Sequence, residues 1–118
     1  MRAYIVWTNV LAADDEAAAR EQAGAFTDPR VICFYDPDWR SGTPFAIHVS
    51  DGVSAKAWDV YMFFAPGARW EDSPPRPVEW AHQLGASTGK GAEEMHFHTG
   101  ELLVQELKRA MACLTPKR

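Results

Sequence analysis

The chain has 118 residues, of which 47% are hydrophobic and 24% charged, as expected for one folded domain rather than a disordered segment. Its net charge of −4, with 16 acidic and 12 basic residues and no block of Lys and Arg, argues against nucleic-acid binding. Because the apolar runs are too short to cross a bilayer and Cys33 and Cys113 match no known spacing, we expect a cytoplasmic protein with reduced thiols and no membrane contact.

Two apolar segments in the first third of the chain predict strands. Ala3–Val10 and Val31–Tyr35 are both rich in β-branched and aromatic residues. A helical segment separates them, and a strand–helix–strand unit favours parallel pairing through a right-handed crossover. The sequence therefore predicts a parallel pair of buried strands.

The helix between these strands has clear local signals. Asp14 or Asp15 can cap it, because a carboxylate accepts hydrogen bonds from the free backbone N–H groups of the first turn. Glu16 and Arg20 have the spacing of an i,i+4 ion pair. The pattern predicts a helix that runs to about Phe26.

The segment Trp39–Val49 is ambiguous. Gly42 and Pro44 weaken a continuous helix through it. A short helix that begins near Thr43, with Pro44 at its first position, is the alternative. The sequence leaves both interpretations open.

Ala57–Ala65 is apolar on both sides of an extended chain, which is typical of a central strand covered on both faces. We expect it to pair in parallel with Tyr4–Val6 or Val31–Tyr35. A Pro-Gly turn follows it and predicts an antiparallel partner near Arg69.

The last third of the chain predicts a helical turn at Val78–Leu84, a short edge strand at Met95–His98 and a long helix at Glu101–Leu114 capped by Thr99. The buried stripe of that helix consists of Leu103, Leu107, Met111 and Leu114. The predicted fold class is α/β, a three-layer sandwich with a mixed β-sheet and helices on both faces.

Four segments, AYIVW, DPRVICFYDPDW, AWDVYMFF and PPRPVEWAHQL, together resemble a group of small uncharacterised bacterial thioredoxin-like proteins. The resemblance covers roughly Ala3–Leu84 and the last helix. It implies a single thioredoxin-like domain over residues 1–118. Ordinary members of this fold carry a Cys-x-x-Cys motif at the start of the first helix, whereas Thr8–Asp15 here holds no cysteine. The resemblance therefore implies the fold without the redox motif.

Indole and guanidinium side chains recur in the predicted loops. They could form a surface that binds an anionic or aromatic ligand or a partner protein, including a second copy of the chain, because Trp and Arg dominate binding hot spots. They could equally stack on one another within the fold. We name this set the Trp–Arg rim, and it consists of Trp39, Arg40, Arg69, Trp70, Arg76 and Trp80.

His96 and His98 form a His-x-His pair that would point to one side of a strand. They could share a metal ion, with His82 or Glu94 as a third ligand, or they could simply be solvated. Cys33 lies in an apolar strand, where an inert core thiol is more typical than a reactive one.

Other segments suggest little chemistry. Gly85–Lys90 lacks the spacing of a phosphate-binding loop. Asp59 could be a tuned buried acid or a polar residue at the start of a strand.

Three functions follow. The first is a non-catalytic thioredoxin-like binding module that needs no cofactor and uses the Trp–Arg rim. The second is a thiol-dependent oxidoreductase that relies on Cys33 or on a cysteine supplied by a partner. The third is a metal-binding protein that uses His96 and His98.

Overall fold

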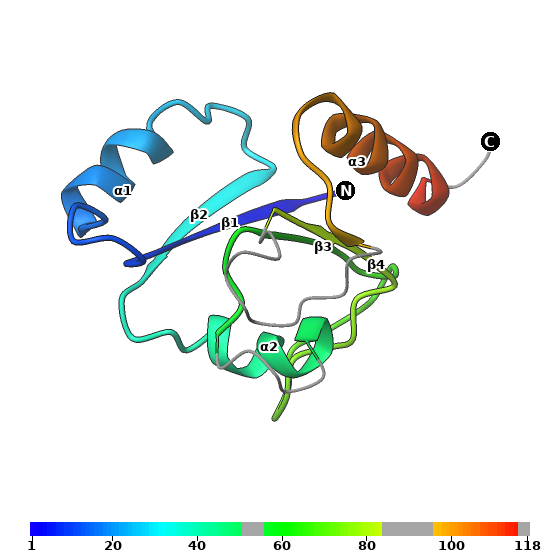
Figure 1. The fold of residues 1–118 in the computed structure, drawn as a ribbon, viewed down its shortest axis with the longest axis horizontal. Coiled ribbons are helices and arrows are strands. Elements are labelled where there is room, and N and C mark those ends of the chain that lie inside the picture. Colours follow the sequence, from blue (N-terminus) through cyan, green and yellow to red (C-terminus); the bar gives the residue numbers. More distant parts are fainter. Residues whose placement is uncertain (51–55, 84–95, 116–118) are drawn as a thin grey trace. The chain divides into compact units, whose positions relative to one another are not determined.

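A computed structural model describes residues 1–50, 56–83 and 96–115 of the chain. By its contacts the chain divides into two compact units, Met1–Gly42 and Thr43–Arg118. The elements follow one another along the chain as in Figure 1: β1 (Ala3–Thr8), α1 (Glu16–Ala23), β2 (Val31–Asp36), α2 (Gly42–Ser50), β3 (Val60–Phe63), β4 (Glu79–His82) and α3 (Gly100–Leu114).

The first unit is a strand–helix–strand unit. β1 and β2 pair in parallel, in a register that runs from Ala3 opposite Val31 to Thr8 opposite Asp36. Helix α1 connects them and contacts β2. The predicted parallel pairing is therefore confirmed, whereas the predicted burial of the two strands is wrong, since every residue in them except Asp36 is exposed or half-buried.

Helix α1 is capped as the sequence predicts. The Asp15 carboxylate accepts a hydrogen bond from the backbone N–H of Ala18 at 2.8 Å. The Arg20 guanidinium donates to Glu16 at 2.7 Å, one turn away. The helix ends at Ala23 rather than near Phe26, because Gly24 follows it and glycine is a poor helix former.

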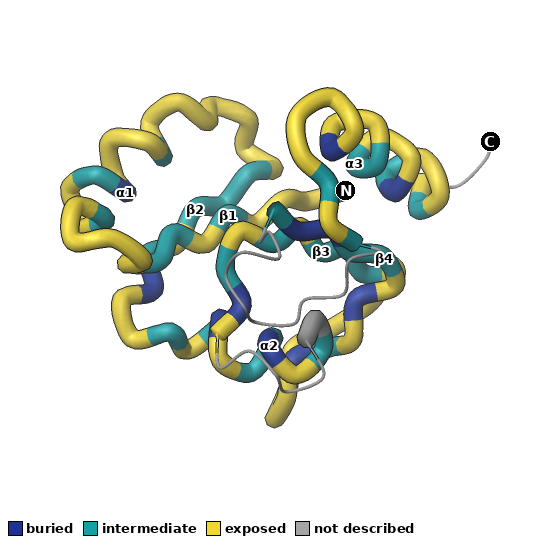
Figure 2. The backbone as a smooth tube through the Cα atoms, in the orientation of Figure 1, coloured by how far each residue is buried: buried dark blue, intermediate teal, exposed yellow. Residues whose placement is uncertain are grey.

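One face of the β1–β2 sheet carries exposed apolar side chains. Tyr4 is 59% exposed and Phe34 51% exposed, and their rings stack with centroids 6.3 Å apart. Within residues 1–42, all of which the structure describes, Ala19 is the one buried apolar side chain. Figure 2 shows how much of this unit is exposed.

The second unit contains the antiparallel pair of β3 and β4. Val60 lies opposite His82, and Phe63 lies opposite Glu79. The predicted helical turn at Val78–Leu84 is therefore wrong, since most of that segment is a strand. The predicted central strand is shorter than Ala57–Ala65, and its antiparallel partner is β4 rather than a strand near Arg69. Among the described strands it is not central, because β3 and β4 form a two-stranded sheet.

The Pro-Gly turn explains the misplaced partner. Ala68 donates its backbone N–H to the carbonyl of Ala65, and Gly67, with φ 84°, occupies the left-handed region. Proline followed by such a glycine is typical of a type II turn, which splays the flanking strands instead of pairing them. The chain returns to β3 only after the proline-rich segment.

The described strands form two separate two-stranded ladders, β1–β2 and β3–β4. The predicted parallel pairing of Ala57–Ala65 with Tyr4–Val6 or Val31–Tyr35 is not among these ladders. The predicted α/β class is confirmed, with three helices and two small sheets among the described residues.

Both faces of the β3–β4 sheet are covered within the second unit. On one face Phe45 and Ala46 of α2 pack in a cluster, whose other members are Ala57, Val60, Met62 and Trp80. On the other face Glu79 binds α3 through Arg109, and α3 contacts both strands. Because side chains alternate along a strand, Trp80 and Glu79 serve opposite faces.

Two further predictions concern α2 and α3. The ambiguous segment is helical from Gly42, with Pro44 in the first turn but not at the first position. In α3 Leu103 is buried, and the other three members of the predicted stripe are half-buried. Thr99 is the N-cap residue, although its side chain makes no capping hydrogen bond.

The predicted edge strand near His98 is reduced to one bridge between Phe97 and His82, and Met95 lies outside the described residues. Among the described residues no helix has the length and apolar character needed to span a membrane.

Candidate functional site

The Trp–Arg rim is divided between the two units. Trp39 and Arg40 belong to the first unit, and the other four members belong to the second. Arg40, Arg69 and Arg76 are exposed, whereas Trp39 and Trp80 are half-buried. The rim is therefore best considered as separate groups.

Trp39 and Arg40 lie in a loop that is held by Asp36, the last residue of β2. The buried Asp36 carboxylate accepts hydrogen bonds from the backbone N–H of Arg40 at 2.9 Å and of Ser41 at 2.7 Å. The Ser41 hydroxyl donates a third at 2.6 Å. Trp39 has a φ of 57°, which a non-glycine residue rarely adopts. Asp36 thus fixes the loop that carries this half of the rim.

These contacts set the charge state of Asp36. Burial by itself raises the pKa of the carboxyl, but the hydrogen bonds from Ser41 and Arg40 and the Arg40 charge outweigh it. The pKa of Asp36 is therefore lower than usual, and the group is a carboxylate at neutral pH.

Of the three indoles in the Trp–Arg rim, that of Trp70 is the most exposed. It is 48% exposed and lies edge-on to Phe45 of α2, with ring centroids 5.1 Å apart and an interplanar angle of 82°. Phe45 also contacts Phe64 and His48, and the His48 Nε2 lies 3.2 Å from the carbonyl oxygen of Pro74. An aromatic cluster thus supports a partly exposed indole.

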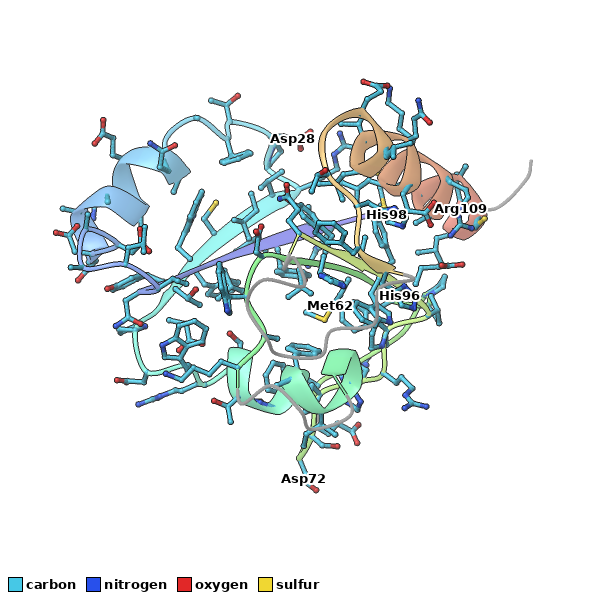
Figure 3. The ribbon with its side chains drawn as sticks, in the orientation of Figure 1. Asp28, Met62, Asp72, His96, His98 and Arg109 are labelled. Atoms are coloured by element: carbon cyan, nitrogen blue, oxygen red, sulfur yellow. The ribbon has the colours of Figure 1, made fainter. Side chains whose placement is uncertain are left out.

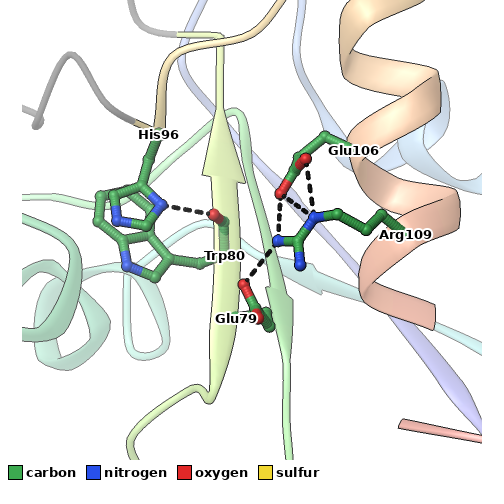
Figure 4. A network of polar contacts seen from close by, with 5 residues as sticks. All are labelled: Glu79, Trp80, His96, Glu106 and Arg109. Carbon is green, nitrogen blue, oxygen red and sulfur yellow. Dashed lines mark hydrogen bonds and ion pairs between the residues drawn. The ribbon is translucent and has the colours of Figure 1, made fainter. Parts of the chain in front are cut away.

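Trp80 lies in a different environment. Its indole stacks on the His96 ring with centroids 4.0 Å apart and an interplanar angle of 18°. The His96 Nδ1 lies 2.9 Å from the carbonyl oxygen of Trp80 (Figure 4). Because a carbonyl only accepts hydrogen bonds, the Nδ1 must carry the proton. Trp80 is a structural contact of β4 rather than a free member of the rim.

His82 and His98 complete this cluster. His82 is fully buried, with its ring stacked on Trp80 and tilted against Phe97 at centroid distances of 5.6 and 5.7 Å. The backbone N–H of His98 donates to the carbonyl of His82 at 3.0 Å. Residues 96–98 therefore lie along the outer edge of β4, and Figure 3 labels both His96 and His98.

The metal hypothesis finds little geometric support. Within residues 1–50, 56–83 and 96–115, no three His, Cys, Asp or Glu side chains are grouped so that they could hold a metal ion. One ring nitrogen of His96 is already hydrogen-bonded to Trp80. Glu94, one of the two candidate third ligands, lies outside the described residues.

Arg109 of α3 joins two carboxylates. It donates to Glu106, one turn earlier in the same helix, and to Glu79 of β4 at 3.0 Å (Figure 4). These hydrogen bonds raise the pKa of Arg109 and lower that of Glu106, to which His98 and His96 add a smaller effect of the same sign. The network attaches α3 to the sheet.

The other candidate residues from the sequence have the following locations in the structure. Cys33 is half-buried in β2, Cys113 is exposed near the end of α3, and both are free thiols. Asp59 is exposed just before β3, which matches the interpretation as a polar residue at the start of a strand. Gly85–Lys90 lies outside the described residues.

Two features were not predicted from the sequence. The spacing of Glu106 and Arg109 would have indicated their pair, but no local signal connects Arg109 to Glu79, 30 positions away. The Asp-Pro-Asp start of the loop after β2 is a turn signal that could have identified the Asp36 contacts.

Comparison of the chain with protein-family models, with curated protein sequences and with solved structures gives no match.

Proposed function

We propose that this chain is a non-catalytic thioredoxin-like binding module, folded as a three-layer sandwich with a mixed sheet. The order of elements supports this proposal, since a parallel strand–helix–strand unit precedes an antiparallel pair that is followed by a helix. The segment before α1, Thr8–Asp15, contains no cysteine, and this supports a binding role over a redox role.

Trp70 is the observation that carries the proposed function. Its indole is half-exposed although it is large and apolar, and Phe45 holds it edge-on. Exposed Arg69 and Arg76 are close to it in sequence. A partly exposed indole with arginines close to it in sequence has the chemistry of protein-binding hot spots, because both side chains combine apolar area with hydrogen-bond donors.

The proposed ligand is a protein segment or a small molecule that covers the Trp70 indole. Arg69 and Arg76 would contribute hydrogen bonds or an ion pair to it, but Glu71 and Asp72 follow directly in the sequence and balance their charge. Apolar contact with the indole therefore supplies most of the binding free energy in this proposal.

Selection of displayed peptides tests the proposal. Peptides enriched on the wild-type protein should bind the Trp70→Ala variant at least about tenfold more weakly, a loss of about 1.4 kcal/mol. Phe26→Ala is the matched control, because Phe26 is similarly exposed, at 45%, but lies in the first unit. Isothermal titration calorimetry of each peptide measures the effect.

Equal affinity of the enriched peptides for the wild type and for Trp70→Ala would reject this site. If the Arg69→Ala and Arg76→Ala variants bind the peptides as tightly as the wild type does, while Trp70→Ala binds them more weakly, the binding site is limited to the indole. Circular dichroism of each variant separates loss of binding from loss of fold.

The two alternatives have less support. A thiol-dependent activity would rest on Cys33, which is half-buried within a strand and does not lie at the start of a helix. A metal-binding function would need His96 to give up its contact with Trp80 or to bind through its other ring nitrogen.

A further inference from the structure

The loop of residues 64–78, which carries Trp70, joins β3 to β4 without a helix or strand of its own. The base of this loop is closed by the backbone N–H of Val78, which donates to the carbonyl of Phe63 at 2.8 Å. Three prolines follow Trp70 in the loop, and because proline has no N–H, this part cannot pair as a strand does. The position of the middle of the loop therefore depends on side-chain contacts.

Two residues on one face of α2 make such contacts. Phe45 meets the Trp70 indole edge-on, with ring centroids 5.1 Å apart. His48 places its Nε2 3.2 Å from the carbonyl oxygen of Pro74. Phe45 and His48 are three positions apart in the helix, and their rings meet at a centroid distance of 6.5 Å. One helical face therefore holds two points of the loop that lie four positions apart in the sequence.

The contact from His48 serves a buried acceptor. Pro74 is buried, whereas the residues between it and Trp70 are exposed. Asp72 lies at the tip of the loop (Figure 3), so the chain runs outward after Trp70 and returns to α2 at Pro74. Without a donor the Pro74 carbonyl would be a buried acceptor left unsatisfied, which is unfavourable. Since a carbonyl only accepts hydrogen bonds, the His48 Nε2 carries the proton.

We infer that His48 is a positioning residue, which orders the loop so that the Trp70 indole is ready to receive a ligand. This inference rests on the proposed binding role of Trp70. If the Pro74 carbonyl is released, the indole keeps its edge contact with Phe45 but loses the nearby fixed point in the backbone. The loop then samples conformations that do not present the indole, and a ligand binds only the remaining fraction of molecules.

Three variants of α2 test this role. His48→Leu removes the donor, whereas His48→Gln retains a side-chain N–H that can reach the Pro74 carbonyl. Ile47→Ala is the matched control, because Ile47 is adjacent in the same helix and is 63% exposed. The NMR order parameter of the Trp70 backbone N–H is measured without any ligand. We expect it to fall from about 0.85 to below about 0.6 in His48→Leu, and to stay high in His48→Gln and Ile47→Ala.

Binding kinetics separate positioning from direct contact. A positioning residue sets the fraction of molecules that can bind, so its loss lowers the association rate and leaves the dissociation rate unchanged. For the peptides enriched on the wild type, stopped-flow association with His48→Leu should be at least about threefold slower. A faster dissociation with an unchanged association rate would show that His48 contacts the peptide directly, and would overturn the inference.

The wild-type protein provides a test that needs no variant. Long-range ¹⁵N NMR of the imidazole rings, at about pH 8.5 where an ordinary histidine is neutral, should show the Nε2–H tautomer for His48. The Nδ1–H tautomer would overturn the inference, since it leaves no donor for the Pro74 carbonyl. Should circular dichroism show that His48→Leu is unfolded, His48→Phe replaces it under the same criteria.

The positioning role and the proposed function can fail separately. An unchanged order parameter in folded His48→Leu would reject the positioning role, even if Trp70→Ala weakens peptide binding. Equal peptide affinity of the wild type and Trp70→Ala would reject the proposed function, and the order parameter would then still show whether His48 fixes the indole.

Discussion

Asp36 shows how one side chain can organise a loop. Three donors from Arg40 and Ser41 converge on its carboxylate, and all belong to the turn that leads from β2 toward α2. Without the carboxylate, backbone N–H groups would lose their partner in a partly buried turn, which costs about 1–3 kcal/mol for a buried group. The conformation of the loop that carries Trp39 and Arg40 therefore depends on Asp36.

Substitution of Asp36 by asparagine should destabilise the protein by about 1–2 kcal/mol at neutral pH, because the amide accepts weaker hydrogen bonds than the carboxylate. Since the pKa of Asp36 is lowered by folding, the carboxylate contributes its full stability above the unfolded pKa of about 3.9. That contribution disappears as the pH falls through the lower folded value.

Urea denaturation at several pH values measures this effect. The difference in unfolding free energy between the wild type and Asp36→Asn should be constant from about pH 5 to 7 and should shrink below about pH 4. Asp38→Asn is the control, because Asp38 is exposed in the same loop. A difference that stays constant down to about pH 2 would contradict the assigned role of the charge.

Local contacts were predictable from the sequence at this scale, and distant ones were not. The Asp15 cap and the Glu16–Arg20 pair join residues three and four positions apart, so their spacing alone indicates them. The contact of His96 with Trp80 spans 16 positions. Nothing in the spacing of His96 and His98 distinguishes a ring stacked on an indole from a metal ligand.

At the scale of elements, α3 shows how a stripe of apolar residues docks a helix. Leu103 is 7% exposed, whereas its neighbour Leu102 is 66% exposed. The two residues have the same chemistry and adjacent positions, so they differ only in the face of the helix that they occupy. Leu103 and Leu102 are therefore a matched pair for measuring how much the docking of α3 contributes to the free energy of unfolding.

Leu103→Ala should lower the free energy of unfolding by about 2–4 kcal/mol, because it removes buried methyl groups and leaves a cavity. Leu102→Ala should change it by less than about 0.5 kcal/mol. Urea denaturation of both variants, followed by circular dichroism, gives the comparison. Equal losses in the two variants would mean that α3 is not docked through the face of Leu103.

The strands were predicted less accurately than the helices. Helical periodicity over 15 residues identifies α3 and its buried face. β4 has four residues, and its partner depends on the turn type formed around Gly67 rather than on its own sequence. The sequence EWAH of β4, which lies within Val78–Leu84, is compatible with a helical turn or with a strand. Pairing with β3 decides in favour of the strand.

At the scale of the whole molecule, the buried apolar side chains are distributed unevenly. Apart from prolines, the described ones in the second unit are Ala46, Ala57, Ala81, Leu103 and Ala110, whereas the first unit has only Ala19 among residues 1–42. The order of elements was largely predictable, because hydrophobic patterning fixes each of them locally. The separation into two ladders was not, because pairing between distant strands leaves no local signal.

A peptide of residues 1–42 should not fold by itself. Units of about 40 residues without disulfides or metals bury too little apolar surface to offset the loss of conformational entropy. Circular dichroism should show the spectrum of a disordered chain, and the amide proton chemical shifts in an NMR spectrum should be poorly dispersed. A well-dispersed spectrum of the isolated peptide would show that the parallel pair of β1 and β2 is stable by itself.

The exposed face of β1 and β2 has a consequence for the living cell. Translation delivers β1, α1 and β2 before any residue of the second unit, so the exposed side chains of Tyr4 and Phe34 are among the first to leave the ribosome. Chaperones that hold nascent apolar segments recognise features of this kind. Synthesis of this chain therefore presents an apolar surface to chaperones and proteases as soon as its first third has emerged.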